Sequence, residues 1–482
     1  MVNLRRSLVI TFLSSSGATL LQFVASIVLA RLLSPQEIGV FSITVVFVNI
    51  AHIFRDFGVT TYLQSEAELT PEKIRAAIGL LVTTSWFIAI TLFGASDFIA
   101  VWFKEPAIAP VMRVLALGFL FIPFGSVTHA LLTREFAADK QALVTIAGTT
   151  SFAVSCVGLA YLGFGTMSLA WGNFINIIVC AIAYVPLRPP GTPWLPSFRN
   201  WGRVFHFGMG SLISNTASAV NNAIPDLLLA KLAGARQVGL FSRANSTVTI
   251  FGYVAGATVN YGAISYVSQA HHRGESLTPL LNKAVAMLTG LGWPVLGVTA
   301  VLGKEIVTAL YGDKWLDCVV AIPALTVSAA ISMLFNYTPA ALTAIGRPYL
   351  SAIPTVVTIA ARLGFGWLLF DGTLGAFSWA ICVATIAAAP MMLWLHHRFL
   401  AYSLGSILKA IVPSVAVTVI CIGASLLLRR IHVPGAHPIV QLLVIGMPII
   451  PVWYLALRLT GHSLLKEVHH FAIALKNRLA PS

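Results

Sequence analysis

The chain has 482 residues, of which 57% are hydrophobic and only 10% are charged, whereas a water-soluble domain usually carries about 25% charged residues. Because lipid can cover the outside of a membrane protein, this composition excludes a soluble globular fold and indicates a chain that crosses a bilayer many times. The formal net charge of +14 does not indicate nucleic-acid binding, because the basic residues stand singly in short loops.

The N-terminal segment begins with a basic pair and continues as a long apolar run. Arg5 and Arg6 precede an uncharged stretch from Ser7 to Ala30. That stretch is longer than the about 7–15 residues of a signal-peptide core and matches the about 20 residues that span a bilayer. We therefore expect a first transmembrane helix that is not cleaved.

Apolar segments of similar length, bounded by charges, Gly or Pro, recur along the whole chain. They predict an all-α integral membrane protein with about fourteen transmembrane helices, and at least twelve. Pro413 interrupts the thirteenth segment, and Pro448 and Pro451 interrupt the last. The predicted helices span residues 8–30, 38–57, 74–95, 108–132, 141–162, 166–186, 204–230, 238–262, 279–302, 318–342, 349–370, 374–395, 407–428 and 438–458.

The longest connection, "LRPPGTPWLPSFRNWGR" from Leu187 to Arg203, is rich in Pro and basic residues, which is typical of a linker. We expect two six-helix lobes on either side of it, followed by two additional helices. The tail has apolar residues at helical spacing with Lys466, Lys476 and Arg478 between them, which predicts an amphipathic helix at the membrane surface. The expected parts are an N-terminal lobe (1–187), a cytoplasmic linker (188–203), a C-terminal lobe (204–400), two helices (401–460) and the tail (461–482).

The distribution of basic residues predicts the orientation of these helices. When the N-terminus is placed in the cytoplasm, most of the 30 Lys and Arg residues fall in loops and termini on that side. Cytoplasmic loops carry such an excess. We therefore expect both termini in the cytoplasm.

One phrase occurs twice at an offset of 200 residues. "LARLLSPQEIGVFS" runs from Leu29 to Ser42, and "LAKLAGARQVGLFS" runs from Leu229 to Ser242. Each copy ends one predicted helix and begins the next, and six helices separate the copies. Because six is an even number, both halves enter the membrane in the same direction, as in transporters built from parallel repeats.

Polar residues form matching stripes on the first and seventh predicted helices. At about 100° per residue, spacings of three and four place them on one narrow face. Polar groups that face hydrocarbon lack water partners, so we expect these faces to line a central water-filled cleft; hydrogen bonding between helices is the alternative. The stripe on the seventh helix is Ser211, Asn215, Ser218, Asn222 and Asp226, and the equivalent positions on the first helix are Thr11, Ser15, Ala18, Gln22 and Ser26, of which all but Ala18 are polar.

Three segments resemble the polysaccharide transporter family of the multidrug/oligosaccharidyl-lipid/polysaccharide flippase superfamily. They are the first copy of the repeated phrase, "FRDFGVTTYLQ" at Phe54–Gln64, and "YGDKW" at Tyr311–Trp315. The chain looks most like the exporters of colanic acid and related exopolysaccharides. This resemblance implies a V-shaped, two-lobed transporter in the bacterial inner membrane. It would flip undecaprenyl-pyrophosphate-linked oligosaccharide repeat units by alternating access, for exopolysaccharide, capsule or lipopolysaccharide synthesis. The resembling segments are not catalytic motifs, so they identify no active-site residue.

A pyrophosphate headgroup requires positive charge in a wet cleft, and the planar guanidinium of Arg suits phosphate. Three Arg residues fall inside predicted spans, where a charge indicates function; Arg362 is the deepest, whereas Arg113 and Arg243 could instead reach the interface. Arg31 and Lys231 occupy equivalent positions and could instead balance helix dipoles. The expected pyrophosphate and sugar contacts are Arg362, Arg113, Arg243, Arg31, Lys231, Asn215, Asn222 and Gln22. Replacing Arg362 by Ala is expected to abolish export.

Two carboxylates are candidates for coupling transport to a proton or sodium gradient. Asp226 ends the polar stripe of the seventh helix, where it could instead pair with an Arg. Asp56 lies at the inner end of the second helix just before Gly58, where a helix-terminus turn is the alternative explanation. His52 is typical of a hydrogen-bonded core histidine, and Asn336 and Tyr337 are sugar contacts suggested by polarity alone.

Rival functions remain within the same superfamily, namely a cation-coupled multidrug extruder and a lipid II flippase. A membrane enzyme is not expected, because the loops are too short to carry a catalytic domain. The five Cys residues lie in apolar stretches without metal-ligand or disulfide spacing, which favours small core residues and no metal or cofactor. The expected partners are the lipid-linked oligosaccharide, membrane lipids, a polysaccharide polymerase and a chain-length regulator, without nucleic acid.

Overall fold

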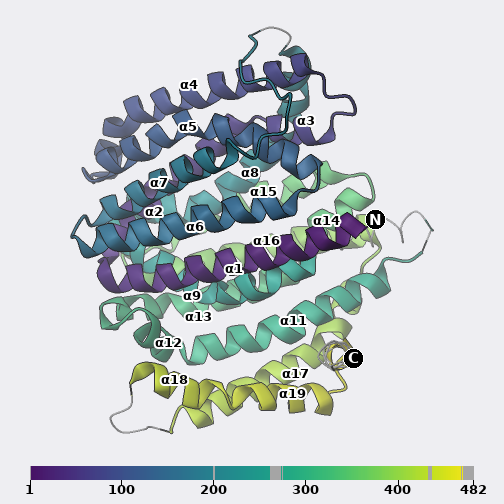
Figure 1. Cartoon of the computed structure of the whole chain (residues 1–482). Coiled ribbons are helices and arrows are strands. Elements are labelled where there is room, and N and C mark those ends of the chain that lie inside the picture. The colour runs from purple at the N-terminus through teal and green to yellow at the C-terminus, as the bar shows by residue number, and fades with distance from the viewer. Residues whose placement is uncertain are drawn as a thin grey trace, which may run out of the picture. The chain divides into compact units, whose positions relative to one another are not determined.

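The computed structural model describes residues 2–198, 201–260, 273, 275–431, 437–467 and 469. For residues 2–9, 12, 203–215, 250–260 and 348 it describes the backbone but not the burial of the side chains. All regular structure within the described residues is helical (Figure 1). The chain is therefore an all-α protein, as its composition predicts.

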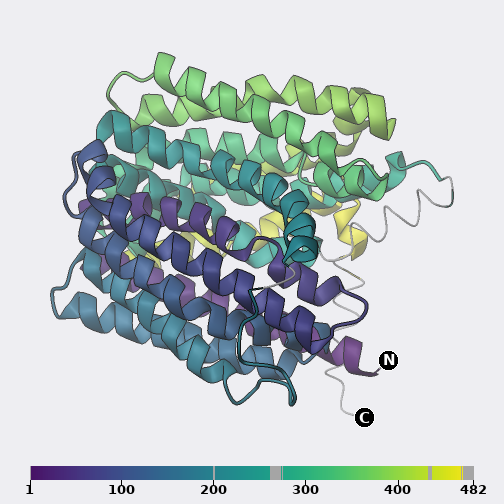
Figure 2. The same cartoon turned by 90° about the horizontal axis from the view of Figure 1, so that it is seen from above.

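The chain forms two compact units, Met1–Ser242 and Arg243–Ser482. The first unit contains α1 (Val2–Leu32), α2 (Pro35–Asp56), α3 (Val59–Ser65), α4 (Pro71–Phe103), α5 (Ile108–Arg134), α6 (Ala138–Tyr161), α7 (Thr166–Tyr184) and α8 (Gly202–Ala233). Helix α9 (Ala235–Asn260) begins in the first unit and continues into the second. Helix α5 packs against α4 and α7, and α6 packs against α7 and α1, so that these helices form a bundle (Figures 1 and 2).

The second unit also consists of packed helices. Helix α16 contacts α13 and α15, and α11 contacts α13 and α17. Its elements are α11 (Thr278–Val301), α12 (Gly303–Leu310), η1 (Asp313–Ala321), α13 (Ile322–Met333), α14 (Thr338–Ala344), η2 (Pro348–Ser351), α15 (Ala352–Leu368), α16 (Leu374–Leu400), α17 (Leu404–Leu428), α18 (Pro438–Gly446) and α19 (Ile449–Leu459).

Within the described residues, 12 helical segments are long and apolar enough to cross a membrane. Each coincides with one of the spans expected from the sequence. The two remaining expected spans, 204–230 and 238–262, fall on the long helices α8 and α9. The chain is a multi-pass membrane protein, and the expected order of its helices is confirmed.

Two expected spans are wrong in detail, because each is broken rather than continuous. The span 318–342 begins as the 3₁₀ helix η1, continues as α13 and breaks at residues 334–337 before α14. Asn336 and Tyr337 therefore lie in a turn and not inside a helix. The last span breaks between α18 and α19 at Pro448. In both places a Pro stands at or next to the start of the new helix, where its missing N–H costs nothing.

Helix α12 occupies the segment between α11 and η1. At the other end of the chain, residues 464–467 are helical. Residues 468 and 470–482 of the expected amphipathic tail lie outside the described residues.

Helix α8 belongs to the first compact unit, because it packs on α2, α3 and α4. The expected linker 188–203 precedes it and lies against the start of α4: the Ser197 N–H donates to the carbonyl oxygen of Arg75 over 2.8 Å. A side chain on Gly79 would lie 2.1 Å from the carbonyl oxygen of Ser197, so only Gly admits this contact. The division into lobes at 188–203 stays a prediction.

The two copies of the repeated phrase contact each other in a reciprocal way. A Cβ atom on Gly39 would lie 1.7 Å from the carbonyl oxygen of Ala235, and one on Gly239 would lie 1.9 Å from that of Pro35. At the offset of 200, Gly39 corresponds to Gly239 and Pro35 to Ala235. The repeat therefore builds a close, two-fold backbone contact between α2 and the first turn of α9, which a side chain at either Gly would prevent.

Candidate functional site

A pocket of about 460 Å³ opens in the first unit, lined by residues of α2, α3, α5 and α7. Its volume is typical of small-molecule sites, which measure about 300–1,000 Å³. Most of its lining side chains carry polar groups. They are Arg55, Asp56, Thr60, Thr61, Ile122, Gly125, Ser126, His129, Asn176, Ile177, Cys180, Ala181 and Tyr184.

The end of α2 places two charged residues at this pocket. The helix ends at Asp56, and Phe57 and Gly58 both have positive φ values, of 42° and 69°. This left-handed turn, which Gly permits without strain, redirects the chain into α3. Tyr62 of α3 is 2% exposed and anchors that short helix in the core, so that the turn has one fixed path.

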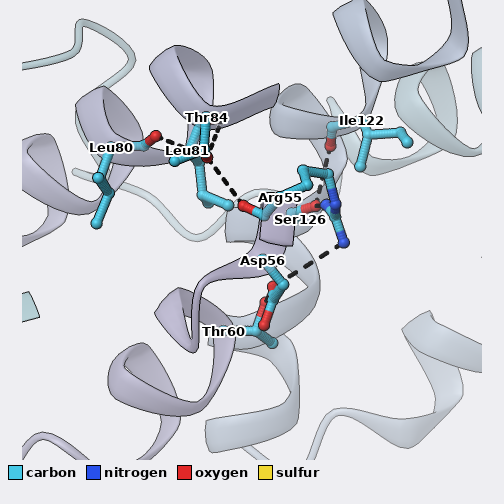
Figure 3. Close-up of polar contacts among 8 residues, drawn as sticks. All are labelled: Arg55, Asp56, Thr60, Leu80, Leu81, Thr84, Ile122 and Ser126. Atoms are coloured by element: carbon cyan, nitrogen blue, oxygen red, sulfur yellow. Dashed lines mark hydrogen bonds and ion pairs between the residues drawn. The ribbon is translucent and has the colours of Figure 1, made fainter. Parts of the chain in front are cut away.

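Arg55 is the main cationic group of the pocket (Figure 3). Its side chain is only 13% exposed, and its Nη1 donates to the Ser126 Oγ over 3.0 Å. The nearest acidic oxygen, Oδ1 of Asp56, lies 4.0 Å from its Nη2, and its Nε is buried without a hydrogen-bond partner among the described residues. Because a guanidinium offers five N–H donors, Arg55 retains the capacity to bind an anion.

Neighbouring groups hold the end of α2 in place around Arg55. Thr84 of α4 donates its hydroxyl to the carbonyl oxygen of Arg55 over 2.9 Å. Thr60 of α3 donates its hydroxyl to Asp56 Oδ1, and Figure 3 shows both contacts converging on the last turn of α2. The cation is thus positioned by α4, α5 and its own helix before any ligand arrives, which reduces the entropic cost of binding.

The opposite wall of the pocket is a face of α7. Asn176, Cys180 and Tyr184 are spaced by four residues and so lie on one side of the helix. The Tyr184 hydroxyl lies 3.1 Å from Nδ1 of His129 on α5, and Nδ2 of Asn176 donates to the carbonyl oxygen of Gly148 on α6 over 2.8 Å. This wall carries hydrogen-bonding groups and one aromatic ring but no charge from α7.

Of the ten site residues expected from the sequence, nine have described side chains, and Asp56 alone among these nine lines this pocket. Arg113 of α5 instead pairs with Asp97 of α4: the Nη2–Oδ2 distance is 2.5 Å, and both side chains are substantially exposed. Its Nε also donates to the Ser96 Oγ over 3.1 Å. These contacts fasten α4 to α5.

Arg243 and Arg362 lie in the second unit. The guanidinium of Arg243 lies 5.7 Å from the ring centre of Tyr311 and 5.9 Å from that of Trp315, within the range of cation–π contacts. Trp315 is completely buried, so the "YGDKW" segment forms a structural base beneath this Arg. Arg362 is half-buried on α15.

The remaining expected residues lie on α1 and α8. Arg31 and Lys231 are exposed, and Nζ of Lys231 donates to the Trp102 carbonyl oxygen over 3.0 Å and lies 4.4 Å from the centre of its ring. Gln22 and Asn222 are exposed, and Asp226 is half-buried. The side chain of Asn215 lies outside the described residues. These residues stay predictions of contacts to substrate or to a coupling ion.

Sequence reasoning missed Arg55 because it placed this residue among the basic residues at the inner helix ends. The signal was its position directly before Asp56 and the helix-ending Phe57–Gly58 turn, inside the "FRDFGVTTYLQ" segment. Cys180 is a second correction: the other four Cys residues are buried, as expected, but Cys180 is half-buried and lines the pocket.

Other parts of the described structure offer less for an anionic ligand. Within the described residues, no group of three His, Cys, Asp or Glu side chains could hold a metal ion. A pocket of about 350 Å³ in the second unit is lined by α11, α17, α19 and Gly446 of α18. The described residues that line it include no charged side chain, so they offer no partner for an anion.

Solved structures with a similar fold are membrane transporters. A lipid II flippase, MurJ, in an inward closed conformation matches 93% of this chain and 99% of its own length, with a TM-score of 0.74 and 11% identity. An inward-facing multidrug resistance transporter of the MATE family matches 80% of this chain and 95% of its own, with a TM-score of 0.63 and 16% identity. At these identities the likeness establishes the fold alone.

Relatives of known name take part in polysaccharide synthesis. The succinoglycan biosynthesis transport protein ExoT of Rhizobium meliloti is 24% identical over 98% of this chain and 96% of its own length. The teichuronic acid biosynthesis protein TuaB of Bacillus subtilis is 21% identical over 86% and 88%. The lipopolysaccharide biosynthesis protein WzxC of Escherichia coli is 20% identical over 60% and 59%.

A family model described as "Polysaccharide biosynthesis protein" matches residues 28–320. This range includes the repeated phrase in both copies, the "FRDFGVTTYLQ" segment and the whole pocket. Because the match covers more than half of the chain, the protein belongs to the family of polysaccharide biosynthesis proteins, as its resemblance to the polysaccharide transporters implies.

Proposed function

We propose that the protein is a flippase that moves undecaprenyl-pyrophosphate-linked oligosaccharide repeat units across the bacterial inner membrane. The units would serve exopolysaccharide, capsule or lipopolysaccharide synthesis. The observation that carries this proposal is the pocket at the end of α2, where a largely buried Arg55 retains free donors next to a wall of sugar-compatible polar groups. Relatives named for transport in polysaccharide synthesis support the same substrate class.

The pyrophosphate is the part of such a substrate that a membrane resists most, because its charge must leave water. Arg55 is held by Ser126 and Asp56, and its planar guanidinium can donate two parallel hydrogen bonds to a phosphate. The pocket therefore supplies a fixed partner for the charge, while the polyprenyl tail stays in lipid. Asp56 lies beside this cation and is the carboxylate best placed to couple substrate binding to a proton or sodium ion.

The remainder of the proposal concerns topology and mechanism. The excess of Lys and Arg on one side of the helices favours cytoplasmic termini. The parallel repeat favours alternating access between two lobes. Movement without chemical change is the proposed activity, so the protein would act as a transporter and not as an enzyme, in company with a polymerase and a chain-length regulator.

The test is replacement of Arg55 in cells that depend on this protein for their polymer. Arg55→Ala, produced at the normal level, should abolish export and cause lipid-linked repeat units to accumulate inside the cell. Arg113→Ala is the matched control, because Arg113 is also an intramembrane Arg but pairs with Asp97 away from the pocket. Normal export by Arg55→Ala would refute the assignment of the anion site.

The cation-coupled multidrug extruder is distinguished by its ligand. An organic cation would be repelled by Arg55, whereas a pyrophosphate would be attracted. Efflux of organic cations that persists in Arg55→Ala and is lost in Asp56→Asn would favour the extruder over the flippase.

A further inference from the structure

The face of α7 that lines the pocket is not explained by the binding of a phosphate. Asn176, Cys180 and Tyr184 project from successive turns of α7 toward α5 and α6. None of them carries a positive charge, and Arg55 lies on a different helix. A second chemical group of the ligand would therefore meet this wall.

Tyr184 is held in a single orientation by α5. A Cβ atom on Gly125 would lie 2.9 Å from Cδ2 and 3.6 Å from Cε2 of the Tyr184 ring, so the absence of a side chain at Gly125 lets the ring lie close to the helix backbone. His129, one turn further along α5, fixes the hydroxyl at 3.1 Å. The side chain is nevertheless only half-buried, which leaves part of the ring open to the pocket.

A fixed aromatic ring with a polar tip matches the chemistry of a pyranose. One face of a sugar ring presents C–H groups of slight positive charge, which pack on the negative face of an aromatic ring. The rim of the sugar carries hydroxyl groups that require hydrogen-bond partners when they leave water. Tyr184 supplies the ring, and the groups beside it supply partners.

Asn176 is oriented to present an acceptor. Its Nδ2 is engaged by the carbonyl oxygen of Gly148. Within the part of the chain that the structure describes, its Oδ1 receives only the weak S–H donor of Cys180, at 3.8 Å. A Cβ atom on Gly148 would lie 2.5 Å from Cys180 Sγ and 3.4 Å from Asn176 Nδ2, so Gly148 is what allows α7 to approach so closely. The acceptor and the ring of Tyr184 thus stand two turns apart on one wall.

The charge of the pocket selects among sugars. Its lining contains one cation, Arg55, and one carboxylate, Asp56. When a phosphate engages Arg55, a second negative charge on the adjacent sugar would meet Asp56 without a compensating cation. The pocket therefore fits a neutral hexose better than a uronic acid at this position.

We infer that Tyr184, His129 and Asn176 form a subsite for a neutral sugar, the first of the repeat unit, directly beside the phosphate held by Arg55. This inference rests on the proposed function and adds a specificity wall to it. Arg55 binds the part that is common to all such lipids. The α7 wall binds the part that differs between them.

The test measures equilibrium binding to the purified full-length protein in lipid nanodiscs. The three probes are undecaprenyl pyrophosphate, the same lipid carrying glucose, and the same lipid carrying glucuronate. The wild-type protein should bind the glucose lipid about tenfold more tightly than undecaprenyl pyrophosphate, as expected for one fixed aromatic contact with its hydrogen bonds. It should also bind the glucose lipid more tightly than the glucuronate lipid, whose carboxylate would meet Asp56. Tyr184→Ala should lose the tenfold preference over undecaprenyl pyrophosphate and bind undecaprenyl pyrophosphate unchanged, whereas the discrimination against glucuronate, which rests on Asp56, should remain.

Two further variants keep the result decisive. Tyr184→Phe retains the ring but loses the hydroxyl contact with His129, so it should lose about two- to threefold for the glucose lipid alone. Tyr161→Ala removes a Tyr that is 82% exposed at the end of α6 and should change no affinity. If Tyr184→Ala weakens all three probes equally, Tyr184 supports the fold and the sugar subsite is refuted.

The proposed function fails separately from this inference. Arg55→Ala should weaken all three probes by a similar factor, because they share the pyrophosphate. If Arg55→Ala binds all probes as the wild type does, the anion site is wrong, whatever Tyr184→Ala does. Tighter binding of the glucuronate lipid than of the glucose lipid would overturn the assignment to a neutral sugar.

Discussion

The two ends of α2 have different roles: one makes a backbone contact, and the other carries charged residues of the pocket. At its first residues, α2 contacts the start of α9 through Gly39 and Gly239, which are equivalent in the repeat. At its last residues, Arg55 and Asp56 line the pocket, and the residues 200 positions later are Ala255 and Gly256. The repeat therefore preserves an architectural contact in both halves, whereas the charged site occurs in one half only.

The residues just before Gly39 and Gly239 also differ between the two copies of the repeat. In the first copy Ser34 caps α2: its Oγ accepts from the Glu37 N–H, and Glu37 Oε2 accepts from the Ser34 N–H over 2.7 Å. In the second copy Gly234 takes a left-handed φ of 81° instead. A side-chain cap in one copy and a glycine turn in the other thus lead the backbone into the same glycine contact. The two copies share the contact and not the cap.

The largest effect is expected from filling the glycine contact. Gly39→Leu and Gly239→Leu each force a side chain into a carbonyl oxygen less than 2 Å away, which overpacks backbone and should destabilise the fold by about 3 kcal/mol or more. Thermal unfolding of the detergent-solubilised protein measures this. Gly17→Leu is the control, since nothing lies within 4 Å of a Cβ there.

Equal losses in the two glycine variants would support the reciprocal contact. If either variant unfolds at the wild-type temperature, the two copies do not pack as described.

The next-largest effect tests whether Arg55 binds the substrate or stabilises the fold. Arg55→Lys keeps a charge but loses the planar fork, so export should fall by about tenfold rather than vanish. Its thermal stability should stay close to that of the wild type, in contrast to Gly39→Leu. Polymer secreted per cell and unfolding temperature are measured together. A large loss of stability with normal export would assign Arg55 to the architecture.

A smaller effect is expected at Asp56, which lies beside Arg55 and accepts a hydrogen bond from the Thr60 hydroxyl. Asp56→Asn removes a negative charge next to the proposed phosphate position, so the affinity for undecaprenyl pyrophosphate should rise about two- to threefold. If Asp56 also couples transport, imposing a pH or sodium gradient should no longer accelerate transport in this variant. Unchanged affinity and retained coupling would show that Asp56 only stabilises the turn at the end of α2.

The smallest effects are expected at the two turns of the repeat. Ser34→Ala removes a helix cap and should cost about 1 kcal/mol. Gly234→Ala places a side chain at a left-handed φ and should cost about 1–2 kcal/mol. Chemical denaturation in detergent compares them, and no loss in either variant would show that the glycine contact alone holds the backbone path.

The sequence was sufficient to predict most of the fold. Apolar length identified all 12 segments that, within the described residues, are long and apolar enough to span a membrane, because the need to satisfy backbone groups in lipid leaves few alternatives. It did not predict the break between α13 and α14, since the turn at residues 334–337 has no Gly or Pro and Pro339 follows it. A local propensity that is neutral leaves the choice to tertiary packing.

The site was harder to predict than the fold. Depth within an apolar span pointed to Arg362, which lies in the second unit and not at this pocket. Arg113 also falls inside a predicted span, and its ion pair with Asp97 of the neighbouring helix is a contact that periodicity within a single helix cannot reveal. Arg55 stood at a helix end, where a basic residue usually faces water, and only the packing of α3, α4 and α5 around it makes it largely buried. The stripe of Asn176, Cys180 and Tyr184 was readable from its spacing, but its partner Gly125 was not.

The most direct test of the central claim is translocation by the purified chain in liposomes. The substrate is a fluorescent pyrophosphate-linked hexose on a short polyprenyl tail, and a membrane-impermeant quencher reports which leaflet it occupies. The account predicts rapid flipping by the wild type and by Arg113→Ala, and none above the protein-free rate by Arg55→Ala. Flipping by Arg55→Ala at the wild-type rate would contradict it.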